Sequence, residues 1–170
     1  MKELEFQTLV RKAVEREGGF GLKMSNRFLV GVPDLLVHLP GAPTMVLEAK
    51  FSKVASTVRP YRLELSPRQS LTLRQMAGAG MVAGVVSLIR TDKLYGFRAM
   101  HIREFEGEAS IRLPGLTYCW CNRAALPEAI VSGLRSLAEG IACVPRSLPA
   151  PELSVPLRAG GRPSGRPSVQ

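Results

Sequence analysis

The chain has 170 residues, enough for one domain with a sizeable core and too few for two ordinary domains. Its formal net charge of +9 favours an anionic partner such as nucleic acid or a membrane surface. The charged N-terminus excludes a signal peptide, and the longest uncharged apolar run, residues 76–89, is too short to span a bilayer. The three cysteines, without a secretion signal, indicate a reducing compartment, so a soluble cytoplasmic protein is expected.

The first expected element is a helix over residues 2–17. Apolar side chains recur there at helical spacing, and the two glycines at 18–19 are a stop signal. Residues 20–30 then favour a strand with an irregular end.

The most informative segments are residues 33–39 and 44–51, which predict two short strands. Both are apolar, and the Pro-Gly pair between them predicts a tight turn. When the hairpin is folded about Gly41, Leu36 lies opposite Val46, and this register fixes every other pair.

Three charged side chains of this hairpin share one face of the predicted sheet. The register pairs Asp34 with Glu48, and the alternation of side chains along a strand turns Lys50 to the same face. Like charges opposite each other destabilise a sheet, and isolated charges are costly in strands that are apolar on both sides. A divalent cation would relieve the repulsion, so the pattern predicts a metal site.

The remaining elements complete an α/β pattern. They are a loop over residues 52–65, a helix from Ser66 to Ala79 with Ser66 as its cap, strands over 81–90 and 94–100, a weaker strand over 116–121 and a helix over 126–142. The core order α-β-β-β-α-β-β predicts a sandwich with a central mixed sheet flanked by helices on both faces. The folded domain is expected over residues 1–143, and the Pro-, Gly-, Ser- and Arg-rich residues 144–170 are expected to be disordered.

Asp34 followed by Glu48-x-Lys50, in this strand–turn–strand setting, resembles the PD-(D/E)XK nuclease superfamily. The segments GVPDLLV, VLEAKF and LSPRQ are more narrowly similar to VRR-NUC domains and to the related Holliday-junction resolvases, which are common in phages. The resemblance covers roughly residues 1–100 and implies a restriction-endonuclease-like fold. Residues 101–170 match no family that we can name.

The resemblance implies a site where Mg²⁺ or Mn²⁺ supports hydrolysis of phosphodiester bonds. Asp34, Glu48 and the backbone carbonyl of Ala49 are the implied ligands of a cation that would polarise the phosphate and acidify a bound water. Lys50 would orient the attacking water and offset charge in the transition state. Gln69 matches a glutamine of related nucleases that would help to hold substrate or water.

The superfamily often adds an acid from the first helix, for which Glu3 and Glu5 are the candidates. At about 100° per residue, Glu3 lies nearer the apolar face that meets the sheet, so Glu3 is the predicted metal ligand. Simpler interpretations stay open. The charged triad of the hairpin could lie on a solvated face, Glu3 could be an exposed acid in a first helical turn, and Gln69 an ordinary exposed helix residue.

Basic residues gather around the hairpin. Those predicted to bind nucleic acid are Lys23, Arg27, Lys53, Arg59, Arg62 and Arg68. Half of them lie in the loop after the second hairpin strand, where they would neutralise phosphates on either side of the scissile one. The alternative for any single residue is a loop made basic for solubility.

The sequence therefore predicts a Mg²⁺- or Mn²⁺-dependent DNA endonuclease in the cytoplasm of a bacterium or a phage-infected host. By resemblance, the favoured substrate is branched DNA such as a four-way junction. A homodimer is expected because two opposed strands must be cut. Two alternatives are a less selective nuclease or nickase on flaps or single strands, and a nuclease-like DNA-binding module that no longer cuts. The intact set of Asp34, Glu48 and Lys50 counts against the second.

Overall fold

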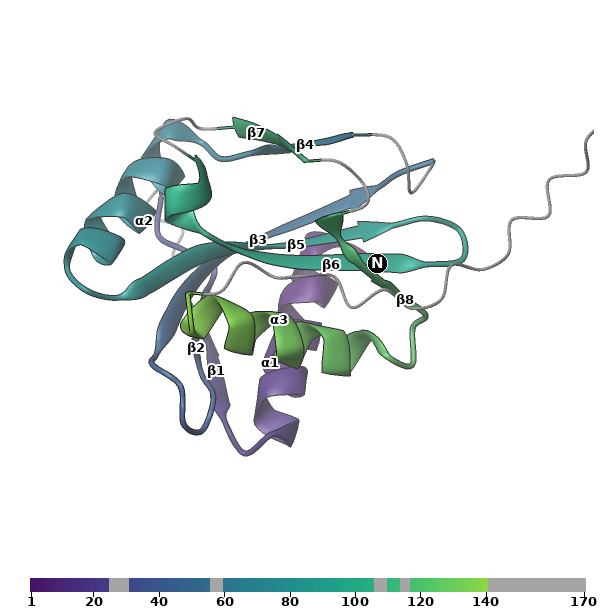
Figure 1. Cartoon of the computed structure of the whole chain (residues 1–170), viewed down its shortest axis with the longest axis horizontal. Coiled ribbons are helices and arrows are strands. Elements are labelled where there is room, and N and C mark those ends of the chain that lie inside the picture. The colour runs from purple at the N-terminus through teal and green to yellow at the C-terminus, as the bar shows by residue number, and fades with distance from the viewer. Residues whose placement is uncertain (25–30, 56–59, 106–109, 114–116, 141–170) are drawn as a thin grey trace, which may run out of the picture.

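The computed structural model describes residues 1–24, 31–55, 60–105, 110–113 and 117–140. A six-stranded sheet forms its centre (Figure 1), in the spatial order β1 (Phe20–Lys23), β2 (Leu35–His38), β3 (Met45–Lys53), β5 (Val82–Arg90), β6 (Tyr95–His101) and β8 (Cys119–Cys121). β3 runs parallel to β5, and every other neighbouring pair in this sheet is antiparallel. The sheet is therefore mixed, as the sequence predicts.

Helices cover both faces of the sheet, which confirms the predicted α/β sandwich (Figure 1). They are α1 (Glu3–Arg16), α2 (Pro67–Gly78) and α3 (Leu126–Ala138). Each begins within a residue of its predicted start, and α3 ends four residues before the predicted end at 142. In the view of Figure 1, α2 lies above the sheet and α1 and α3 lie below it.

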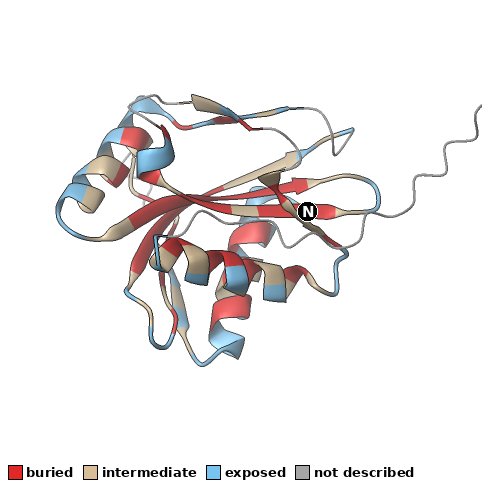
Figure 2. Cartoon of the chain, viewed as in Figure 1, coloured by how far each residue is buried: buried red, intermediate tan, exposed pale blue. Residues whose placement is uncertain are grey.

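The alternation of side chains separates two cores, one on each face of the sheet. Leu47 and Ala49 of β3 belong to the core that α1 and α3 cover, whereas Val46 belongs to the core that includes Leu73 of α2. The central strands are buried along most of their length (Figure 2). Because Glu48 follows Leu47, its side chain points to the face of the sheet that carries α2.

The hairpin between β2 and β3 has the predicted register. Leu36 pairs with Val46, and the Ala42 N–H donates to the Leu39 carbonyl at 3.0 Å to close the turn. Gly41 is the third residue of this turn and adopts φ +76°. A type II turn requires a positive φ at that position, which a residue with a side chain disfavours. The local sequence is thus sufficient to fix this pairing.

The predicted loop over residues 52–65 is wrong in part, because it contains a strand. β3 extends to Lys53, and β4 (Tyr61–Glu64) pairs antiparallel with β7 (Ser110–Leu113) in a separate two-stranded sheet. A short 3-10 helix, η1 (Ile102–Phe105), precedes β7. The residues that pair with β4 lie far along the chain, Leu113 opposite Tyr61 and Ser110 opposite Glu64, so no local sequence pattern predicts this strand.

Several predicted elements lie partly or wholly outside the described residues. The predicted tail over residues 144–170 and the end of the last predicted helix lie outside them, as do residues 25–30 of the first predicted strand. Within the described residues, no helix is long and apolar enough to cross a membrane.

Candidate active site

Asp34 stands just before β2 and reaches across to β3. Its Oδ2 accepts a hydrogen bond from the Ala49 N–H at 3.0 Å, at the point where the ladder between the two strands has ended. In a strand, the N–H and C=O of one residue point to the same neighbour. The Ala49 carbonyl therefore lies on the side of Asp34, and the two predicted oxygen ligands come to one edge of β3.

Glu48 is the buried carboxylate of the site, with 2% of its surface exposed. Its Oε1 accepts hydrogen bonds from Lys50 Nζ at 2.9 Å and from Gln69 Nε2. Its Oε2 is buried without a hydrogen-bond partner in the described part of the chain. Burial, and next the Asp34 carboxylate, raise the pKa of Glu48 to about 7, while Lys50 opposes the rise. An orphaned, buried carboxylate oxygen is costly, and a divalent cation would satisfy it.

Gln69 links this carboxylate to the start of α2. Its side-chain Oε1 accepts a hydrogen bond from the Ser66 backbone N–H at 2.9 Å, and its backbone N–H donates to Ser66 Oγ at 3.2 Å. The two bonds together form a capping box. Lys50 Nζ lies 3.4 Å from the same Oε1. Ser66 is the cap that the sequence predicts, whereas the reciprocal role of Gln69 was not predicted, although Ser-x-x-Gln is itself a capping-box signature.

A close backbone contact sets the position of α2 beside Asp34. Gly31 has φ +94°, and a Cβ added to it would lie 2.9 Å from the Cβ of Arg68 in the first turn of α2. Only glycine accommodates both the conformation and the contact. The segment that leads into Asp34 therefore packs directly against the helix that supplies Gln69.

Glu3 is an exposed residue of α1, yet its carboxyl is close enough to the hairpin to interact with Lys50 and Asp34. Glu5 pairs with the N-terminal amine at 3.4 Å. The pKa of Glu3 is raised, chiefly by partial burial of its carboxyl; Lys50 opposes this rise, Asp34 adds to it, and a hydrogen bond from the Phe51 backbone lowers it. The Glu3 carboxyl thus lies within electrostatic reach of the hairpin charges, and its role as a ligand stays a prediction.

The groups present fit a hard divalent cation. Mg²⁺ prefers oxygen ligands and is commonly held by one or two carboxylates with several waters. Asp34, Glu48 and the Ala49 carbonyl supply such oxygens, and Lys50 stands beside them as a cation. Across the residues that the structure describes, no three His, Cys, Asp or Glu side chains gather closely enough to hold a metal alone. The donors therefore suit an open site completed by water, not a closed structural site.

The predicted nucleic-acid contacts are dispersed around this edge. Arg27 and Arg59 lie outside the described residues. The other four are all exposed: Lys23 at the end of β1, Lys53 at the end of β3, Arg62 on β4 and Arg68 on α2. Alternation along β3 turns Lys53 to the face opposite that of Lys50, so Lys53 is the least suited of them to contact a substrate at this site.

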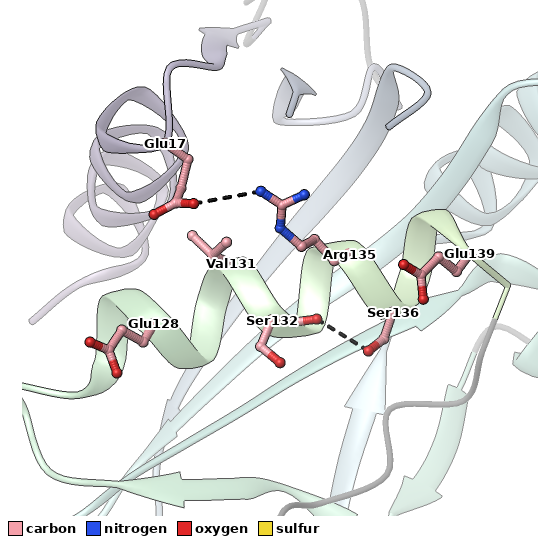
Figure 3. A pocket seen from close by; sticks show the side chains of 7 residues that line it. All are labelled: Glu17, Glu128, Val131, Ser132, Arg135, Ser136 and Glu139. Atoms are coloured by element: carbon pink, nitrogen blue, oxygen red, sulfur yellow. Dashed lines mark hydrogen bonds and ion pairs between the residues drawn. The ribbon is translucent and has the colours of Figure 1, made fainter. Parts of the chain in front are cut away.

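A hollow on the outer surface of α3 lies away from these groups. It has a volume of about 390 Å³ and is lined by three acids, Glu17, Glu128 and Glu139, with Arg135 paired to Glu17 at 3.5 Å (Figure 3). α3 covers the face of the sheet opposite that of Glu48. An excess of acids makes this hollow a poor surface for nucleic acid.

Comparison with known proteins gives a distant structural likeness. No family model matches the chain, and no curated protein matches it significantly. Among solved structures, it is similar to Hjc, a Holliday junction resolvase from Archaeoglobus fulgidus, with 14% identity and a TM-score of 0.47 over 75% of this chain and 97% of that one. A likeness this distant does not show what the present chain does, so a functional conclusion depends on the site.

Proposed function

We propose that this protein is a Mg²⁺- or Mn²⁺-dependent deoxyribonuclease that hydrolyses phosphodiester bonds. The observation that carries the proposal is Glu48, a buried carboxylate with one unpartnered oxygen beside Asp34 and Lys50. A solvated charged face, the simplest alternative, is incompatible with 2% exposure of Glu48. A buried Glu48 opposite the partly buried Asp34 lowers the stability of the fold, and a purely structural hairpin would gain nothing from this arrangement.

The bound cation would supply Lewis acidity and a water of lowered pKa. Asp34, Glu48 and the Ala49 carbonyl would hold it. Lys50, whose ammonium is fixed by Glu48 and Gln69, would orient the attacking water and stabilise negative charge on the phosphate in the transition state. Attack of water forms one P–O bond and breaks another, which leaves a phosphate monoester and a free hydroxyl.

Branched DNA, such as a four-way junction, is the substrate that we propose on the resemblance of the hairpin segments. A homodimer follows from the same proposal, since two opposed strands of a junction must be cut. The basic residues at the sheet edge would hold the backbone independently of sequence.

The test is cleavage of labelled four-way junction, flap, single-stranded and linear duplex DNA, each with Mg²⁺, with Mn²⁺ and with EDTA. We expect metal-dependent cleavage with the junction cut fastest. Cleavage of flaps or single strands in preference to junctions would support a less selective nuclease. Absence of cleavage of every substrate with both metals would overturn the enzyme assignment.

A further inference from the structure

β4 and β7 form a two-stranded sheet that stands apart from the central sheet, on the side of α2 (Figure 1). We call this pair the β4–β7 ribbon. Its inner face is apolar, with Leu63 1% and Leu113 7% exposed. Its outer face carries Arg62 directly opposite Arg112, and both side chains are exposed.

Two arginines opposite each other in an antiparallel pair are unfavourable for the free protein. Arg62 is partly compensated by Glu64 at 2.9 Å and by Ser110 Oγ at 3.3 Å, but the charged pair is more than 60% exposed and therefore weak. Arg112 forms no hydrogen bond or ion pair with the described residues. The outer face of the ribbon thus carries two exposed arginines on neighbouring strands, of which Arg62 is paired with an exposed acid, Glu64.

A hydrogen bond anchors the ribbon to the strand that carries the site. Tyr61 Oη and Ser52 Oγ are 2.6 Å apart, and Ser52 lies two residues beyond Lys50 on the same face of β3. The Tyr61 ring also meets Tyr118 edge-on, with ring centroids 6.3 Å apart. The outer face of the ribbon is therefore held at a fixed place above the face of the sheet that carries Glu48.

We infer that Arg62 and Arg112 bind consecutive backbone phosphates of the DNA arm that leads to the cleaved bond. The inference rests on the proposed function and extends it to residues 110–113, a part of the chain that the sequence did not connect to DNA. Guanidinium groups bind phosphate oxygens in a bidentate manner. A phosphate placed near both groups would also remove the repulsion that the free ribbon bears.

The experiment compares wild type with Arg62→Ala, Arg112→Ala and the double variant in binding of a fluorescent 30-base-pair duplex and a four-way junction, in EDTA over a range of salt. Each lost phosphate contact should make the negative slope of log K against log salt shallower by about 0.9, so the double variant should change it by about twice that. Arg112→Lys should retain most of the slope. Arg16→Ala is the matched control, because it removes an exposed arginine from α1, on the opposite face of the sheet, and it should change neither the affinity nor the salt slope.

Thermal unfolding of the free protein separates binding from structure. Arg112→Ala should leave Tm unchanged or raise it, because the cross-strand repulsion is removed. A lower Tm with weaker binding would overturn the inference in favour of a structural role. If wild type binds DNA and the variants keep its affinity and salt slope, this inference is overturned but the proposed function is not. Failure of wild type to bind either DNA would overturn the proposed function as well.

Discussion

The Gln69 amide joins the first turn of α2 to Glu48 of β3. It donates to Glu48 through Nε2 and accepts from the Ser66 backbone through Oε1, so one side chain both caps a helix and orients the buried carboxylate. Helix capping and site geometry are therefore coupled.

Substitution of Gln69 should reveal both roles. Gln69→Ala should lower the free energy of unfolding by about 1 kcal/mol through the lost cap, and should also slow cleavage because Glu48 loses its orienting donor. Ser66→Ala breaks the cap from the other side without touching Glu48. Urea unfolding and cleavage rates measure the two effects. Equal losses of cleavage in the two variants would show that Gln69 acts only as a cap.

The charged triad of Asp34, Glu48 and Lys50 should be required for DNA cleavage more than for DNA binding. Asp34→Asn keeps an acceptor for the Ala49 N–H but removes the charge, and Lys50→Ala removes the ammonium beside Glu48. We expect each to reduce the single-turnover cleavage rate by about 100-fold or more, with duplex affinity in EDTA within a few-fold of wild type. Variants that cut at the wild-type rate would show that the triad is assigned wrongly.

The metal-free protein should lose stability as pH rises. The folded-state pKa of Glu48, about 7, lies above the ordinary 4.5. Its stabilising contribution is therefore fully present below pH 4.5 and is lost as pH rises through 7. At about 1.4 kcal/mol per pKa unit, the loss is on the order of 3 kcal/mol.

Glu48→Gln should be more stable than wild type at pH 8 and equal to it near pH 4.5, as judged by urea unfolding in EDTA. Mg²⁺ should narrow the gap at pH 8, because it would bind the folded wild type. Glu64→Gln is the control, since Glu64 is exposed. A gap that does not change with pH would contradict the burial of a titrating Glu48.

Gly31 should tolerate no side chain. In Gly31→Ala the added Cβ would be strained at φ +94° and would lie 2.9 Å from the Arg68 Cβ. The substitution should therefore destabilise the protein by about 1–3 kcal/mol and push the segment that leads into Asp34 away from α2. Gly78→Ala in α2 has nothing within 4 Å of the added Cβ and should stabilise by roughly 0.5–1 kcal/mol. Thermal unfolding and cleavage rates check both. A Gly31→Ala variant as stable and active as wild type would show that this contact relaxes freely.

The sequence by itself determined the elements whose encoding is local. The three helices follow from apolar spacing with Ser and Pro at a helix start, and the β2–β3 register follows from the turn at Gly41 together with alternation. These interactions join residues that are near in the chain, so they can be predicted from the sequence without knowledge of the fold. The shared face of Asp34, Glu48 and Lys50 was predictable for the same reason.

Only the tertiary structure decided which distant segments meet. The pairing of Arg62 with Arg112, the bond from Gln69 to Glu48 and the approach of Glu3 to the hairpin all join residues brought together by packing of the two cores. Such contacts depend on which surfaces are buried together, and the local pattern of apolar residues does not predict this. The hairpin could therefore be predicted to carry the charges, whereas the burial that leaves Glu48 with an unpartnered oxygen is a property of the whole fold.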